Sequence, residues 1–118
     1  MNENYPLMHA ELKDWMRKLG AELPGTMKGF SDLHEQSTKP GHLTNKHKEL
    51  IALGIAITVR CDGCIAYHIH DALNAGSTRQ EILETIGVAI LMGGGPAVVY
   101  GAEALEALNQ FESESETQ

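Results

Sequence analysis

The chain carries both of its cysteines in one short stretch, and a histidine follows them closely. Cys61 and Cys64 are separated by two residues, and His68 comes four residues after the second cysteine. On an α-helix, at about 100° per residue, these three side chains fall within about 60° of one another, while His70 falls on the opposite side. We therefore expect one helix face to carry two thiols and a base, with His70 outside the set.

Two thiols at this spacing favour redox chemistry. They can close a small disulfide ring, and the positive end of a helix dipole lowers the pKa of a thiol placed there. His68, at i+4 from Cys64, can take its proton and leave a thiolate that attacks peroxides or disulfides. Cys64 is the predicted attacking thiol and Cys61 the resolving thiol. The reverse assignment stays open, because the first cysteine of such motifs is often the more exposed one.

Packing and metal binding are the alternative roles for the cysteine pair. Small cysteines are common in protein interiors, and two thiols with a histidine could hold zinc. Structural zinc sites usually take four ligands from two separated pairs, and no second Cys or His pair follows here at a suitable spacing. We therefore favour the redox pair.

Composition limits the classes of partner. The chain has 118 residues, a net charge of −7 and a pI near 5.2, which suits one domain and argues against a nucleic-acid partner. Residues 86–102 are uncharged, but residues 93–96 interrupt them, so neither half is long enough to span a bilayer. Residues 1–5 lack the features of a signal peptide. We expect a cytoplasmic protein with no membrane partner, and there a vicinal cysteine pair is more often catalytic than structural.

Apolar periodicity predicts an all-α single-domain bundle of about six helices that positions this motif. The first helix is expected over roughly residues 8–20, with Gly20 as its stop, and the second starts at Pro24. The third begins near Thr44, and its apolar body, residues 50–59, is typical of a central helix buried on nearly every side.

The remaining helices follow the cysteines. The fourth ends near Gly76, and a capping box formed by Ser77 or by Thr78 starts the fifth. The sixth runs from Pro96 to about residue 108, and residues 111–118 are expected to be a disordered acidic tail. Three histidines of the first half have no shared spacing, so we expect them to be solvated or packing residues rather than ligands: His34, His42 and His47.

Glu49 begins the apolar body of the third helix. From spacing alone it is best explained as a first-turn glutamate that favours the helix dipole. Together with the cysteine stretch, however, it completes a pattern that resembles the carboxymuconolactone decarboxylase superfamily, and more narrowly the small relatives of alkyl hydroperoxidase D. The pattern is Glu49, then Cys-Asp-Gly-Cys at 61–64, then His68. Residues 74–82 and 94–97 resemble the turn and the later helix break of that family.

The resemblance implies an all-α fold whose subunits assemble as trimers or hexamers. Residues 43–108 would be the motif-bearing core of a single domain that spans residues 1–118. The resemblance also implies peroxidase or disulfide-reductase activity through the two cysteines, with Glu49 and His68 as a proton relay. Glu49 thereby becomes a predicted catalytic residue. Gly63 departs from relatives that carry a bulkier residue or a histidine there, which puts an extra relay role at this position in doubt.

The predicted function is thiol-dependent reduction of hydroperoxides by Glu49, Cys61, Cys64 and His68. This redox couple needs no bound cofactor or metal, but it needs an external dithiol as electron donor. Helix geometry puts Glu49 and His68 about 6 Å apart in height, a gap that one water or a tilted crossing could close. Two rival functions remain: decarboxylase or isomerase chemistry on a small lactone with Glu49 and His68 as acid and base, and a non-enzymatic redox-sensing helical oligomer.

Overall fold

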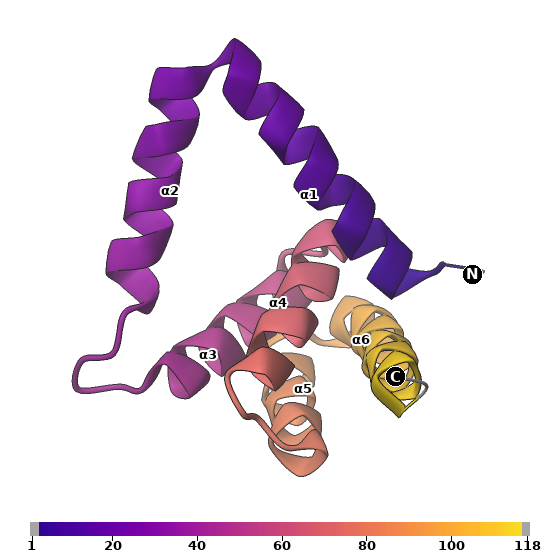
Figure 1. The fold of residues 1–118 in the computed structure, drawn as a ribbon. Coiled ribbons are helices and arrows are strands. Elements are labelled where there is room, and N and C mark those ends of the chain that lie inside the picture. The colour runs from indigo at the N-terminus through magenta and orange to yellow at the C-terminus, as the bar shows by residue number, and fades with distance from the viewer. Residues whose placement is uncertain (1–2, 117–118) are drawn as a thin grey trace.

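The computed structural model describes residues 3–116, and the regular secondary structure in that range is helical (Figure 1). Six helices follow one another: α1 (Tyr5–Glu22), α2 (Pro24–Thr38), α3 (Asn45–Thr58), α4 (Asp62–Asn74), α5 (Arg79–Gly93) and α6 (Gly95–Glu116). This order confirms the predicted all-α fold. None of the described helices combines the length and the apolar character that crossing a bilayer requires.

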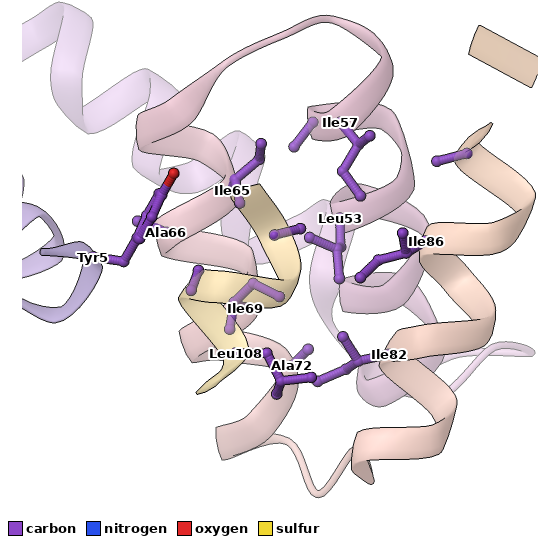
Figure 2. Packing of buried hydrophobic residues seen from close by; sticks show 14 of the residues in the cluster. Tyr5, Leu53, Ile57, Ile65, Ala66, Ile69, Ala72, Ile82, Ile86 and Leu108 are labelled. Carbon is purple, nitrogen blue, oxygen red and sulfur yellow. The ribbon is translucent and has the colours of Figure 1, made fainter. Parts of the chain in front are cut away.

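Helices α3 to α6 surround one apolar core, and Figure 2 shows side chains from all four pointing into it. Within it, Ile65 and Ile69 lie four residues apart on α4 and are fully buried, because i and i+4 share one helix face. Leu53 of α3 and Ile82 of α5 are also fully buried. Each such side chain contributes roughly 1.5–3 kcal/mol to folding through its burial. The core therefore fixes α4, which carries the cysteine motif, from several sides.

Side-chain caps define where two of the core helices begin. The Thr44 hydroxyl accepts a hydrogen bond from the backbone N–H of His47 at 3.1 Å, which starts α3 where it was predicted. Thr78 and Glu81 form a reciprocal capping box at the start of α5. Ser77 does not take that role: its side chain is buried, and its hydroxyl has no hydrogen-bond partner within residues 3–116.

The second half of α1 and all of α2 form a region that we call the arm, residues 13–38. Figure 1 shows α1 and α2 as an open hairpin that leaves the core and returns to it at α3. The first half of α1 packs on α4 and α6 through the buried Tyr5 and His9, but no residue of the arm is buried. The arm instead exposes six large apolar side chains: Trp15, Met16, Leu19, Leu23, Phe30 and Leu33.

Two of the predicted elements need correction in the first half of the chain. Helix α1 begins at Tyr5, where Asn4 caps it, and continues through Gly20 to Glu22. Helix α3 is buried on one side only, since Ile51 and Ile55 are more than half exposed. Its apolar surface is wider than the contacts within one chain can cover.

The predicted disordered tail is wrong over most of its length, because α6 continues to Glu116. Phe111 is buried, at three residues from Leu108, and so extends the apolar stripe of the helix by one turn. Glu112 adds an ion pair with Arg79 at the start of α5. Residues 117–118 of the predicted tail lie outside the described residues. Helix α6 also starts one residue earlier than predicted, at Gly95.

Gln110 of α6 joins the two ends of the chain. Its Oε1 accepts a hydrogen bond from the backbone N–H of Tyr5 at 2.7 Å, and its Nε2 donates to the carbonyl of Glu3 at 2.8 Å. The backbone N–H groups in the first turn of an α-helix have no acceptor within the helix. In α1, a side chain from the other end of the sequence accepts from one of them.

Candidate redox site

Cys61 and Cys64 form a disulfide at the start of α4, with their Cα atoms 5.1 Å apart. This distance lies in the usual range for bridged cysteines. Cys61 was predicted to lie on the helix. It instead occupies the N-cap position just before Asp62, in an extended conformation. Its sulfur accepts a hydrogen bond from the backbone N–H of Cys64 at 3.2 Å. The two sulfurs thus lie at the positive end of the α4 dipole.

The turn before the disulfide has an unusual backbone conformation, and the glycine between the cysteines is closely packed. Arg60 has a φ of 62°, the left-handed conformation that a non-glycine residue adopts rarely. A Cβ atom at Gly63 would come within 2.9 Å of the Leu12 side chain. The missing side chain at Gly63 therefore allows α1 to pack directly against the cysteine-bearing turn, which gives this departure from the relatives a physical reason.

Glu49 and His68 are in direct contact. The Nδ1 atom of His68 lies 2.8 Å from Oε1 of Glu49, which is only 3% exposed. The predicted gap is therefore closed by the crossing of α3 and α4, without a water between the two groups. Because a carboxylate accepts, Nδ1 carries the hydrogen, and Nε2 is left free to exchange a proton. A buried carboxylate that orients a histidine is a common arrangement for general acid–base catalysis.

His68 lies one helical turn after Cys64, but its hydrogen bond is with Glu49 rather than with the sulfur of Cys64. Among the described residues, two groups of His, Cys, Asp and Glu side chains are close enough to share a metal ion, and neither contains a cysteine. With the two sulfurs bonded to each other, neither is a thiolate that could bind zinc. The disulfide is compatible with the predicted redox pair.

An acidic pair that the sequence reasoning missed lies next to the disulfide. Asp62, between the cysteines, lies close enough to Glu103 of α6 for the two carboxyls to interact, and each has one buried oxygen with no hydrogen-bond partner among the described residues. Burial, followed by the charge of Asp62, raises the pKa of Glu103 above its ordinary value. A proton held between the two carboxyls would satisfy both. No sequence signal pointed to Glu103, because it lies 41 positions from Asp62 and on another helix.

Three further polar residues lie near Glu49 or along α4. Ligand atoms of His34, Glu49 and Asp71 lie within 4.8 Å of one another, although His34 was predicted to be isolated. Its position on the arm, beside the start of α3, could be found only from the fold. His70 bonds Asp71 through Nδ1 at 2.9 Å, and its ring stacks on that of His9.

Comparison with known proteins gives this site a family context. The model of the carboxymuconolactone decarboxylase family matches residues 24–107, which include all four predicted site residues. The chain belongs to the carboxymuconolactone decarboxylase family. An uncharacterized protein of Cupriavidus necator is 37% identical over 94 residues, covering 77% of this chain and 83% of its own length. An uncharacterized protein of Haemophilus influenzae is 33% identical over 98 residues, covering 83% of this chain and 87% of its own.

Solved structures of the same family share the fold. A family member from Legionella pneumophila is 42% identical, with a TM-score of 0.87 over 91% of this chain and 96% of that chain. A family member from Thermotoga maritima, for which a part in an antioxidative response has been suggested, is 26% identical, with a TM-score of 0.81 over 91% of this chain and 94% of that one. The arrangement of the helices is therefore common to this family.

Proposed function

We propose that this member of the carboxymuconolactone decarboxylase family reduces hydroperoxides through Cys61 and Cys64. The observation that carries the proposal is the disulfide at the N-terminus of α4, on the helix whose next turn presents a histidine oriented by the buried Glu49. A reversible dithiol, a helix dipole and a proton-exchanging base are the parts that such a reaction needs.

The reduced protein would begin the reaction with its Cys64 thiolate. The thiolate attacks the terminal oxygen of ROOH, the O–O bond breaks, and the leaving alkoxide takes a proton from His68 to give ROH. Cys64 is then a sulfenic acid. The Cys61 thiolate attacks its sulfur, the disulfide forms, and the hydroxyl leaves with a proton as water. An external dithiol, as in a reducing cytoplasm, restores both thiols and is itself oxidised to a disulfide.

The backbone N–H of Cys64 and the carboxylate of Glu49 have separate roles in this reaction. The backbone N–H of Cys64 donates to the sulfur of the N-cap residue Cys61, and it stabilises negative charge on this resolving sulfur both when it attacks and when the external dithiol releases it. Glu49 holds the His68 ring so that its free Nε2 can exchange protons, and it stabilises the imidazolium that forms. The roles of the two cysteines remain exchangeable in principle, and single-cysteine variants separate them.

We also propose that the chain acts as a homo-oligomer, with a trimer or hexamer as the family resemblance implies. Two apolar surfaces support this proposal, because contiguous exposed apolar surface usually marks an interface. One is the arm. The other is a groove of about 540 Å³ between α3 and α5, which includes Ile51, Ile55, Val88 and Met92. Sedimentation of only a 12.8 kDa species at micromolar concentration would contradict it.

Thiol titration tests the proposed reaction. The protein is fully reduced, freed of reductant and mixed with one equivalent of an organic hydroperoxide. We expect two thiols per chain to be lost, one ROH to be formed, and peptide mapping to recover an intramolecular Cys61–Cys64 bridge. A Cys61→Ser/Cys64→Ser double variant is the control for oxidation elsewhere. Slow loss of thiols without ROH would contradict the peroxidase. Lactone turnover that survives in the double variant would instead support acid–base chemistry by Glu49 and His68.

A further inference from the structure

A second cluster of ligand-competent side chains lies at the junction of α1 and α4, outside the proposed relay. It consists of His9 from α1 and of His70 and Asp71 from α4. One ligand atom from each of the three side chains lies within 4.8 Å of the other two. The proposed peroxidase reaction uses none of these residues, so the cluster needs its own explanation.

His9 is buried to an unusual degree for a histidine without a polar partner. It is 9% exposed, and no hydrogen bond among residues 3–116 uses its ring nitrogens. Its ring stacks on that of His70, with 4.1 Å between the ring centroids, and packs beside the Tyr67 ring, with 4.5 Å between the centroids. Burial, followed by the nearby His70, lowers the pKa of His9. A neutral imidazole ring offers the nitrogen lone pair that binds metal ions.

His70 and Asp71 supply the other two ligands at a suitable separation. Nδ1 of His70 is 2.9 Å from Oδ1 of Asp71. In a tetrahedral site with metal–ligand bonds of about 2.0–2.1 Å, neighbouring ligand atoms are about 3.3 Å apart. A metal ion could therefore replace the hydrogen that now joins the two side chains, with release of a proton. The His70 side chain is 40% exposed on one side, and on the other its ring stacks on His9 and lies beside Phe111.

We propose that His9, His70 and Asp71 form a binding site for a divalent transition-metal ion of the zinc class. Imidazole and carboxylate ligands suit such ions, and three protein ligands leave one position for water. The bound ion satisfies the buried His9 nitrogen and links α1 to α4 just below the arm. This metal site is inferred from the geometry of the three side chains and does not depend on the peroxidase reaction.

A competing group shares Asp71. His34, Glu49 and Asp71 are also within 4.8 Å of one another. Glu49, however, already bonds His68 at 2.8 Å, and His34 is an exposed side chain of the arm. Binding there would require the Glu49–His68 contact to be given up or shared. The site on His9 and His70 avoids this cost, and variants of His34 distinguish the two groups.

Calorimetric titration with Zn²⁺ tests the proposal. The protein is used untagged, with its disulfide formed and its lack of free thiols verified, so that the cysteines cannot act as ligands. Near neutral pH we expect one Zn²⁺ per chain with micromolar or tighter affinity. An excess of Zn²⁺ over protein should also raise the thermal midpoint, by about 5 °C or more when the ion is about 100-fold above its dissociation constant. An absence of saturable binding at this affinity would overturn the proposal.

Three variants locate the ion. His9→Phe keeps an aromatic ring in the stack, and Asp71→Asn keeps the shape of its side chain, so at least one of them should fold. Loss of even an outer-shell partner costs about 10–100-fold in metal affinity, so each should bind Zn²⁺ at least that much more weakly. His34→Gln should bind as the wild type does, and His42→Gln is the control for an exposed histidine outside both groups. Wild-type affinity in folded His9→Phe, or lost affinity in His34→Gln, would overturn the assignment.

Discussion

The core of α3 to α6 and the arm differ sharply in what they bury, although both are made of amphipathic helices. In the core, Leu53, Ile65 and Ile82 are inaccessible to solvent, whereas Trp15, Phe30 and Leu33 of the arm are each more than half exposed. The core contains the disulfide and the Glu49–His68 pair, so the site needs no contribution from the arm to be assembled. Under our two proposals, the core would carry the chemistry, and a partner subunit would cover the arm.

The largest effect is expected inside the core, at the cysteines. Cys64→Ser removes the proposed nucleophile, and peroxide turnover should fall by at least about 10³-fold, because loss of a nucleophile removes the covalent route. Cys61→Ser should still consume one equivalent of peroxide and leave a sulfenic acid at Cys64 that a dimedone reagent traps. If the two variants behave the other way round, Cys61 is the attacking thiol, and its helix-capping position outweighs the neighbouring His68.

Matched leucine truncations test the contrast in burial. Leu53→Ala opens a cavity in the core and should lower the free energy of unfolding by about 2–5 kcal/mol. Leu33→Ala removes a side chain that is 59% exposed and should change the stability of the isolated chain by less than about 0.5 kcal/mol. It should nevertheless weaken self-association in sedimentation experiments. Equal destabilisation by both variants, measured by urea unfolding under dissociating conditions, would break the comparison between core and arm.

A smaller effect is expected at the relay. Glu49→Gln keeps the shape of the side chain and its contact with His68 but removes the charge, so peroxide turnover should fall by about 10²-fold. His34→Gln, on the arm side of Glu49, is the matched control and should stay close to the wild type. The helix content of both variants is checked by circular dichroism. Full activity in Glu49→Gln would show that peroxide turnover does not need this charge; a dipole role would not replace it, because α3 begins at Asn45 and Glu49 lies beyond its first turn.

The smallest effect concerns pH. The pKa of Glu103 is raised in the folded protein, so its contribution to stability is complete below the pKa of the unfolded chain and is lost as the pH rises through the folded value. The free energy of unfolding should therefore decline, as the pH rises above the ordinary glutamate pKa, relative to that of Glu103→Gln, which stays neutral and can donate to Asp62. Parallel pH profiles for the two proteins would show that no proton is held between Asp62 and Glu103.

Sequence patterns gave the helices of the core well, because these depend on local signals. Thr44 and Gly76 mark helix ends through capping and through a φ of 95°, and both act within a few residues. The end of α6 was missed because Phe111 is the last apolar residue of a stripe, and its burial depends on helices distant in sequence. The exposed side of α3 was missed for a related reason: periodicity shows which residues are apolar, not how many copies of the chain share them.

The residues of the candidate site also fall into two groups, those that local sequence patterns identify and those that only the fold brings together. The cysteine pair and His68 were identified from spacing within one helix, and Glu49 was added by family resemblance. The direct contact between Glu49 and His68 depends on how α3 crosses α4, and residue spacing gave only an approximate distance between them. Cys61 was placed on the helix because a spacing argument cannot show where the first turn starts. His34, Asp71 and Glu103 were not grouped with the site at all, because each meets its neighbours through packing between different helices.

The contacts of Gln110 have a mechanical consequence. Since one amide side chain fastens Glu3 and Tyr5 to the final helix, a load that separates the two ends of the chain acts first on these two hydrogen bonds. The buried side chains of Tyr5 and Phe111 resist the same load through apolar contacts, so the two hydrogen bonds add a directional restraint where packing already holds α1 against α6.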